Sequence, residues 1–305
     1  MRKAKQSENI LLEEFLILKK LIKSYMNKRK WKAFDICLKT PYLECKPSSQ
    51  VEVHSLVCHR HIHLYILAIK SFLRFYKDIS VIVHDDGSLS NEDIELLKSH
   101  IKGTKIIDKK NAREKVKKAL KNFPNCQKYR NKHIIAKQLF DYSLISKSDK
   151  IISLDSDILF LKRPERIIEW ISNSKKETLC LYEENPTGQE ILLHLGYDYQ
   201  PDICAGLLCF CKDILDLKLI EEIITKMEKL DWFTTQNIYP VLIRNKADRY
   251  QASILNSDEY QSPNRLNLRF LKESKAVFRH YWSSCNVNSS YLKDFRKVIN
   301  ELRDY

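Results

Sequence analysis

Apolar runs and amphipathic stretches alternate along most of this chain. Strand-like apolar runs occupy residues 51–58, 79–84, 104–107, 150–161, 178–182, 204–210, 250–256 and 276–282. Between them, apolar residues recur at helical spacing over 61–76, 91–101, 112–122, 131–146, 163–171 and 212–230, and again over 290–303. Alternating strands and helices are typical of an α/β fold, so the pattern predicts a doubly wound, mostly parallel central sheet flanked by helices.

The most informative run is 150–161, which reads KIISLDSDILFL. Its near-continuous apolar character predicts a strand buried on both faces of the sheet. Asp155 and Asp157 interrupt this run, and two unpaired carboxylates cannot lie in an apolar core. We therefore expect them where the strand leaves the sheet, at its carboxyl end, which is where open α/β sheets bind ligands. Paired oxygen ligands there suit Mg²⁺ or Mn²⁺; a solvated turn or a helix cap is the alternative.

The N-terminal segment 8–34 has a different character, with apolar residues at helical spacing and lysines opposite them. Its part KKLIKSYMNKRKWK is basic and amphipathic, so it could contact an anionic membrane surface or dock on its own domain. Pro41 and the sequence CKPSSQ then interrupt the pattern. We expect an N-terminal helical extension over 1–48, a catalytic domain over 49–285 and a C-terminal helix over 286–305.

Composition narrows the class of protein. The 305 residues are 44% hydrophobic, enough for a real core, and no apolar run approaches the roughly 18 residues that a membrane span needs. Nine cysteines without paired CxxC motifs, several of them inside apolar runs, indicate a reduced, cytoplasmic protein. A net charge of +14 attracts polyanions, but no nucleic-acid-binding module accompanies it, and a lysine-rich coding bias would give the same composition.

Other polar groups follow the first two predicted strands. Asp85 begins the sequence DDGS after the second strand, where carboxylates can accept hydrogen bonds from ribose hydroxyls or a base; a plain turn is the alternative. His59, His61 and His63 follow the first strand. A shared metal would need an extended backbone there, so phosphate or base contact is favoured. Lys137, on the helix before the central strand, could neutralise a phosphate.

The order of these motifs resembles the GT-A glycosyltransferases, and most closely their family 8-like group. The match is best over AKQLFDYSLISKSDKIISLDSDILFLKRPERI, where a lysine-bearing helix leads into an aliphatic strand with LDSD and then a proline-containing short helix. The resemblance covers about residues 51–282. It implies transfer of a sugar from a nucleotide-sugar donor, a UDP-sugar, with retention, to a glycan, lipid-linked or protein acceptor.

The resemblance also implies roles for individual residues. Asp155, Asp157 and His280 would bind Mn²⁺ or Mg²⁺, which would clamp the donor diphosphate. The remaining residues that would contact the nucleotide sugar are Cys58, His59, Asp85, Lys137, Ser156, Ala205 and Gly206. Gln236 would act in catalysis, and for an inverting reaction the base would be Glu183, Glu184 or Asp202.

The chain departs from the family pattern at three places. Cys204 stands where the family has Asn before Ala-Gly, and Thr235 where it has Asp before Gln. Each departure removes a polar group that would hold the donor sugar. His280 also lacks the Gly and Lys that follow it in the family's closing motif.

Two other functions compete with sugar transfer. Haloacid-dehalogenase-like phosphatases also place Asp-x-Asp after an aliphatic strand, but Leu159 stands where they have Thr or Val, and their motif strand comes first in the fold. A non-catalytic basic binding protein is favoured only by the net charge.

Overall fold

The structure, a computed structural model, describes residues 34–174, 177–183, 190–197, 202–249, 251–262, 275–281 and 289–305. The chain forms two units, Met1–Thr40 and Pro41–Tyr305. The predicted N-terminal helices and their membrane contact fall on residues 1–33, outside the described residues, and the first unit is described only from Phe34, with a short 3-10 helix, η1 (Asp35–Lys39). Within the described ranges, no helix is long and apolar enough to cross a bilayer.

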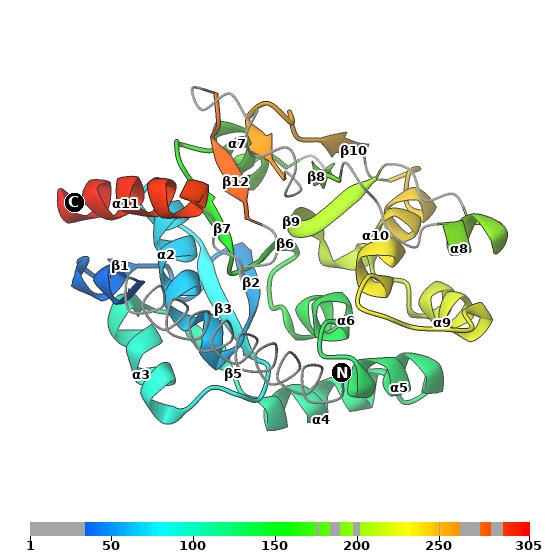
Figure 1. Ribbon diagram of the computed structural model, residues 1–305. Coiled ribbons are helices and arrows are strands. Elements are labelled where there is room, and N and C mark those ends of the chain that lie inside the picture. The colour runs from blue at the N-terminus through cyan, green and yellow to red at the C-terminus, as the bar shows by residue number, and fades with distance from the viewer. Residues whose placement is uncertain are drawn as a thin grey trace, which may run out of the picture. The chain divides into compact units, whose positions relative to one another are not determined.

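The second unit is built on a seven-stranded sheet with strand order β10-β8-β9-β6-β2-β3-β5 (Figure 1). The strands are β2 (Val51–Val57), β3 (Ser80–Asp85), β5 (Lys105–Ile107), β6 (Lys150–Leu154), β8 (Glu177–Tyr182), β9 (Ile203–Cys211) and β10 (Gln251–Ile254). All neighbours pair in parallel except β9, which runs antiparallel to both β6 and β8. The predicted mostly parallel α/β sheet is therefore confirmed. A separate two-stranded sheet joins β1 (Leu43–Glu44) to β4 (Ile101–Lys102).

The apolar run 150–161 is not one strand, as the sequence predicts, but two. After β6 the chain turns through Asp155, Ser156 and Asp157 and continues as β7 (Ile158–Phe160). β7 belongs to a second sheet with β11 (Tyr260–Gln261) and β12 (Phe278–His280). The two carboxylates explain the break, because charged groups leave the buried sheet and the apolar residues after them need new partners.

Helices cover both faces of the large sheet. They are η2 (His59–His61), α2 (Ile62–Leu73), α3 (Asn91–His100), α4 (Lys109–Ala119), α5 (Pro124–Lys132), α6 (Ala136–Ile145), α7 (Glu165–Ser172), α8 (Glu190–His194), η3 (Lys212–Ile214), α9 (Leu217–Lys226), α10 (Thr234–Asn245) and α11 (Ser289–Arg303). Side chains of α4, α5, α6, α9 and α10 form one hydrophobic cluster against β6 and β9. On the other side, α2 packs against β7 and α11 (Figure 1). Every residue of α2 except His63 is buried.

Two predicted helices are shorter than their patterns indicate. The helix expected over 131–146 is divided between α5 and α6, because His133 takes an extended backbone conformation after Lys132. The helix expected over 212–230 starts only at Leu217, where the Asp216 carboxylate accepts hydrogen bonds from the N–H groups of Lys218 and Leu219. Apolar spacing alone continues through both breaks, so it did not reveal them.

A buried ion pair joins α5 to α6. Arg130 Nη2 lies 2.6 Å and Nε 3.0 Å from the two carboxylate oxygens of Asp141, and both side chains are buried. Replacing Arg130 by Met would leave Asp141 without its partner in the core, so we expect the free energy of unfolding to fall by about 3–5 kcal/mol. Urea denaturation measures this loss. As a control, removing the exposed Lys98–Glu95 pair by Glu95→Gln should cost at most about 0.5 kcal/mol; equal costs would contradict the prediction.

Candidate active site

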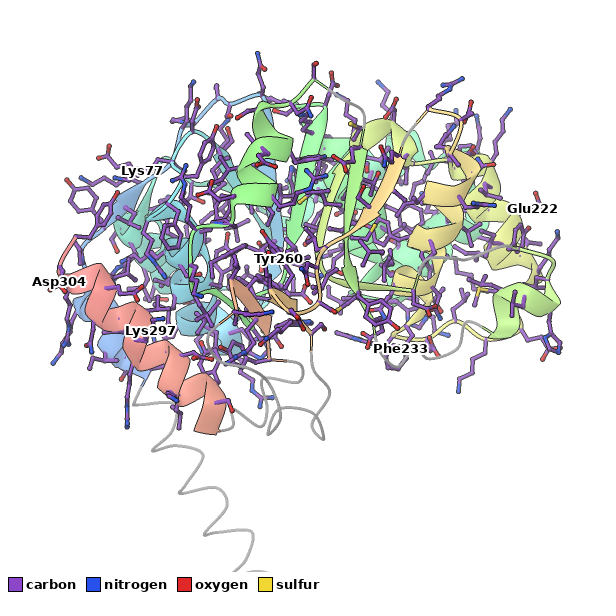
Figure 2. The ribbon with its side chains drawn as sticks, turned by 90° about the horizontal axis from the view of Figure 1, so that it is seen from above. Lys77, Glu222, Phe233, Tyr260, Lys297 and Asp304 are labelled. Carbon is purple, nitrogen blue, oxygen red and sulfur yellow. The ribbon has the colours of Figure 1, made fainter. Side chains whose placement is uncertain are left out.

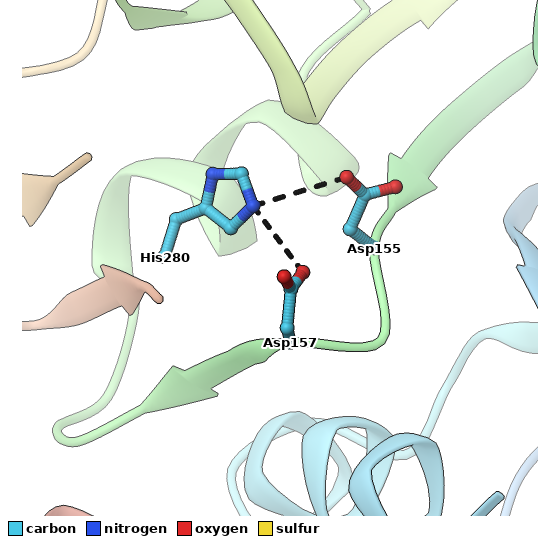
Figure 3. A group of neighbouring side chains, drawn as sticks. All are labelled: Asp155, Asp157 and His280. Carbon is cyan, nitrogen blue, oxygen red and sulfur yellow. Dashed lines mark ion pairs between the residues drawn. The ribbon is translucent and has the colours of Figure 1, made fainter. Parts of the chain in front are cut away.

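Three candidate metal ligands meet at the carboxyl end of β6. Asp155 and Asp157 lie in the turn between β6 and β7, and His280 ends β12 (Figure 3). His280 Nε2 is 3.3 Å from Asp157 Oδ1 and 3.9 Å from Asp155 Oδ2, and one ligand atom of each residue falls within 4.8 Å of the others. β12 pairs antiparallel with β7 so that His280 is opposite Ile158, the residue after Asp157. Strand pairing therefore brings the distant histidine to the two acids, as the sequence-based assignment requires.

Neighbouring side chains fix how these three residues lie. The Gln138 side-chain amide donates to Asp155 Oδ1 at 2.9 Å. Cys204 Sγ lies 3.3 Å from His280 Nδ1, which leaves Nε2 directed at the carboxylates. The His280 ring rests on Gly206: a Cβ added there would be 2.5 Å from Cε1 and 2.6 Å from Nδ1. Such supporting contacts orient metal ligands in many proteins.

The charges of the three residues depend on one another. Burial and the charge of Asp157 raise the pKa of Asp155 to about 6. Burial would raise the pKa of Asp157 too, but the adjacent His280 lowers it. Burial alone would lower the pKa of His280, whereas Cys204 and Asp157 raise it well above its ordinary value. In the metal-free protein, the fold therefore stabilises the charged forms of Asp157 and His280 beside each other, with Asp155 as a second carboxylate.

The cluster opens into a cavity of about 480 Å³. The lining side chains are His61, Ile135, Gln138, Asp155, Asp157, Cys204, Ala205, Gly206, Trp232, Phe233, Thr235, Gln236 and His280. Gln236, in the first turn of α10, accepts a hydrogen bond from the Ala205 N–H at 3.3 Å. Among the described residues that line the cavity there is no Lys or Arg.

The other nucleotide-sugar candidates are not among the described residues of this lining. Cys58 follows β2, and its backbone oxygen accepts a hydrogen bond from the N–H of His61, which does line the cavity. The Asp85 carboxylate accepts from the N–H groups of Gly87 and Leu89, and Lys137 Nζ donates to the Asp85 backbone oxygen at 2.9 Å. His59 Nδ1 forms a hydrogen bond of 2.7 Å with Asp93 Oδ2. Cys58, His59, Asp85 and Lys137 therefore surround the end of β2 and β3, while Ser156 contacts His61 Nδ1 at 3.3 Å.

Of the three candidate bases for an inverting reaction, the two that the structure describes, Glu183 and Asp202, lie outside the described cavity lining. Asp202 precedes β9, and its backbone oxygen accepts from the Glu183 N–H at 3.3 Å. Glu183 is buried, and Glu184 lies outside the described residues. Within the described lining, Asp155 and Asp157 are the only carboxylates, and both belong to the cluster with His280.

Sequence reasoning missed Gln138, Ile135, Trp232 and Phe233 as cavity residues. The charge of Lys137 makes it the conspicuous residue of this segment, but the amide of its neighbour Gln138 is the group that donates a hydrogen bond to Asp155, while Lys137 donates to the Asp85 backbone oxygen. Trp232 and Phe233 come just before Thr235 and Gln236, so their place in the chain was a usable signal. In the sequence, His61 is indistinguishable from its neighbouring histidines; in the structure it lines the cavity, whereas His59 is exposed.

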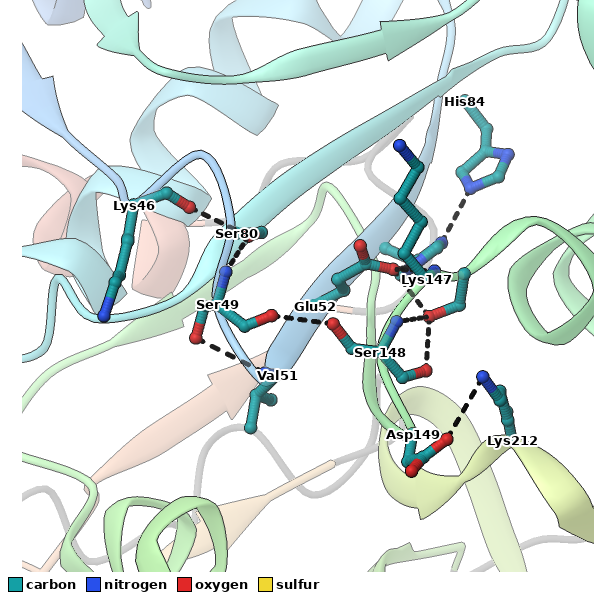
Figure 4. A network of polar contacts seen from close by, with 12 residues as sticks. Lys46, Ser49, Val51, Glu52, Ser80, His84, Lys147, Ser148, Asp149 and Lys212 are labelled. Atoms are coloured by element: carbon teal, nitrogen blue, oxygen red, sulfur yellow. Dashed lines mark hydrogen bonds and ion pairs between the residues drawn. The ribbon is translucent and has the colours of Figure 1, made fainter.

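A network of buried hydrogen bonds contacts the end of β3. The Glu52 carboxylate receives hydrogen bonds from His54, Ser146 and the Lys147 N–H, and His54 Nδ1 lies 2.8 Å from Nε2 of His84, the residue before Asp85 (Figure 4). Burial would raise the pKa of Glu52, but these hydrogen bonds together lower it to about 2. The ionised carboxylate is therefore the form that the fold stabilises.

This lowered pKa predicts a pH-dependent contribution to stability. A carboxylate whose pKa is lower in the folded than in the unfolded chain stabilises above the unfolded pKa and loses this effect as pH falls. We expect Glu52→Gln to cost roughly 3 kcal/mol at pH 7, with the difference from wild type shrinking below about pH 4.5. Urea denaturation over that range measures it. A difference that does not change with pH would show that Glu52 acts through packing alone.

No family model matches the sequence, and no curated protein matches it. Solved structures do match the fold. Mouse xyloside xylosyltransferase 1 aligns with a TM-score of 0.54 and 12% identity over 81% of this chain and 99% of its own. The galactosyltransferase LgtC, solved with donor and acceptor sugar analogues, aligns with a TM-score of 0.54 and 15% identity, over 83% of this chain and 95% of its own. The glycosyltransferase GlyE of Streptococcus pneumoniae aligns with a TM-score of 0.51 and 13% identity, over 84% of this chain and 63% of its own. The sheet, its flanking helices and these neighbours show that the chain has the GT-A fold of glycosyltransferases.

Proposed function

We propose that this protein is a metal-dependent glycosyltransferase that uses a nucleotide-sugar donor, a UDP-sugar. The observation that supports this most is the Asp155–Asp157–His280 cluster in a cavity whose described lining contains no Lys or Arg. A donor diphosphate would meet two carboxylates there, and repulsion would exclude it unless a cation lay between them. The GT-A fold of the solved glycosyltransferases supports the same class of reaction.

The residues of the cluster fit a divalent cation. Two carboxylates and one imidazole whose ligand atoms lie within 4.8 Å suit Mn²⁺ or Mg²⁺. Asp155, Asp157 and His280 would hold the ion, which, when bound, would supply charge stabilisation for the leaving diphosphate. Gln138 and Cys204 would keep the ligands oriented.

The remaining cavity residues would position the sugar. Gln236 is tied to the Ala205 backbone and faces the same cavity as the cluster, so it would contact the donor sugar at the transfer step. An inverting reaction needs a carboxylate base within hydrogen-bond reach of the acceptor hydroxyl. The only described carboxylates in the lining are the two of the cluster, which supports transfer with retention.

Calorimetric titration with UDP tests the donor site. We expect binding in the presence of Mn²⁺ or Mg²⁺ and its loss when EDTA removes the metal. Equal binding with and without metal would contradict the metal-dependent site. Absence of UDP binding under every condition, together with hydrolysis of p-nitrophenyl phosphate, would favour the phosphatase alternative.

Hydrolysis of the donor tests the stereochemistry. With water as acceptor, proton NMR at early times distinguishes the anomers of the released sugar. We expect the α-anomer from UDP-α-glucose or UDP-α-galactose. Initial release of the β-anomer would indicate inversion, and would direct attention to Asp202 and Glu184 as bases.

A further inference from the structure

The cavity has an apolar end to which the proposed metal and donor sites assign no role. Trp232 and Phe233 line it together with Ile135, the residue just before α6. Trp232 is 61% exposed, the highest value among the large hydrophobic residues that the structure describes. By contrast, the side chain of Asp157 is only 15% exposed. The cavity therefore runs from a buried ionic end to an indole that is open to solvent.

Hydrogen bonds hold this aromatic pair in place. Asp231 Oδ1 accepts from the N–H of Phe233 at 2.9 Å and from that of Thr234 at 3.1 Å. The Asp231 N–H in turn donates to the Thr234 hydroxyl at 2.9 Å. Trp232 lies inside this closed turn, directly before α10 (Phe233 is labelled in Figure 2). A side chain on such a turn is presented to a ligand at little entropic cost, because the backbone that carries it is already fixed.

An exposed indole beside a phosphate-binding end fits one class of ligand. A pyranose ring has an apolar face of C–H groups and a rim of hydroxyls, so it packs on an aromatic ring while its hydroxyls stay hydrated or bond to polar groups. Thr235 and Gln236, two of the polar residues of the same lining, follow the pair by only two or three positions. An anionic lipid head group or an acidic peptide would find no described Lys or Arg there.

We propose that Trp232, supported by Phe233, is a stacking site for a pyranose ring of the acceptor, so that the acceptor is a saccharide. This rests on the proposed function, and it specifies the acceptor class. The donor is held through its diphosphate at the buried end, whereas the acceptor enters from solvent, where Trp232 is exposed. A donor sugar on the same indole has the same chemistry, and the experiment separates the two.

Saturation-transfer NMR with methyl glycosides tests the site. The probes are methyl β-D-galactopyranoside, methyl β-D-glucopyranoside and methyl β-D-xylopyranoside, each added to the full chain with UDP and Mn²⁺. We expect the wild type to bind at least one probe, with the strongest transfer to the protons of one ring face. Trp232→Ala should weaken that binding about tenfold, and Trp232→Phe should restore most of it. Tyr305→Ala is the matched control, since Tyr305 is 57% exposed outside the cavity lining.

Other results of these measurements would overturn different parts of the proposal. If no probe binds the wild type, or if Trp232→Ala binds as well as wild type, the stacking site is wrong. If the probe signal disappears when UDP-2-fluoroglucose or UDP-2-fluorogalactose replaces UDP, the indole holds the donor sugar and the acceptor assignment is overturned. UDP binding by all variants, measured calorimetrically, shows separately whether the donor site is intact. A wild type that binds a glycoside but never UDP would overturn the proposed function and not the saccharide site.

Discussion

Replacing Asp157 by Asn is expected to abolish metal-dependent binding of UDP. Asp157 is the better-buried carboxylate of the cluster, and although burial alone would raise its pKa, the adjacent His280 lowers it, so the fold stabilises the ionised form that a metal would require. Asparagine keeps the shape and removes the charge. Loss of a carboxylate that coordinates the metal should reduce metal affinity at least as much as loss of a supporting contact does. We therefore expect metal affinity to fall about 100-fold or more. Calorimetric titration with Mn²⁺, and then with UDP, measures both effects.

Asp149→Asn is the matched control for this substitution. Asp149 lies just before the same strand, β6, but at its other end, where its side chain is 87% exposed and forms an ion pair with Lys212. The control removes the same charge from the same segment. It should therefore bind metal and UDP as the wild type does. Equal losses in both variants would point to a general electrostatic effect, and no loss at Asp157→Asn would remove the cluster from the proposed function.

Replacing Gly206 by Ala is expected to have the second-largest effect. The new Cβ would lie 2.5 Å from His280 Cε1, closer than real contacts allow, so the imidazole or the strand must move. Gly206 also accepts the backbone hydrogen bond of Asp155 at 3.1 Å, so the displacement reaches two of the three ligands. We expect metal affinity to fall at least tenfold and the free energy of unfolding to fall by about 1–3 kcal/mol, the usual cost of overpacking.

A double-mutant cycle identifies the cause of that loss. In a His280→Ala background the ring is absent, so Gly206→Ala should then cost little stability. Urea denaturation of the four proteins measures the coupling. Additive losses would mean that the alanine disturbs β9 itself rather than the histidine, and unchanged metal affinity in Gly206→Ala would contradict the geometry of the site.

Local patterns in the sequence were enough to predict the class of fold. Alternating apolar runs and amphipathic stretches depend on residues a few positions apart, and most of the predicted strands and helices lie close to observed ones, although α8 and α10 are not among the predicted helices. The placement of Asp155 and Asp157 followed from the same kind of reasoning, since a charged pair inside an apolar run must lie where the run leaves the sheet. The structure confirms this, because β6 ends at Leu154.

The same local reasoning failed where an element ends without a change of pattern. The apolar residues of β7 look like a continuation of β6, although they pair with β12 in a different sheet. The apolar spacing that predicts one helix over 131–146 runs across the end of α5 and the whole of α6, which are two separate helices. Hydrophobicity reports that a residue is buried; it does not report which neighbour buries it.

The sequence by itself therefore determined the alternating α/β architecture, the carboxylate pair at a strand end and the list of candidate ligands. Only the tertiary structure decided which candidates meet. The antiparallel pairing of β12 with β7 brings His280 to Asp157, the turn before α10 brings Trp232 to the same cavity, and Glu183 stays out of its lining. The physical reason is that strand pairing and cavity shape arise from contacts between segments far apart in the chain, whereas sequence periodicity reports only on neighbours.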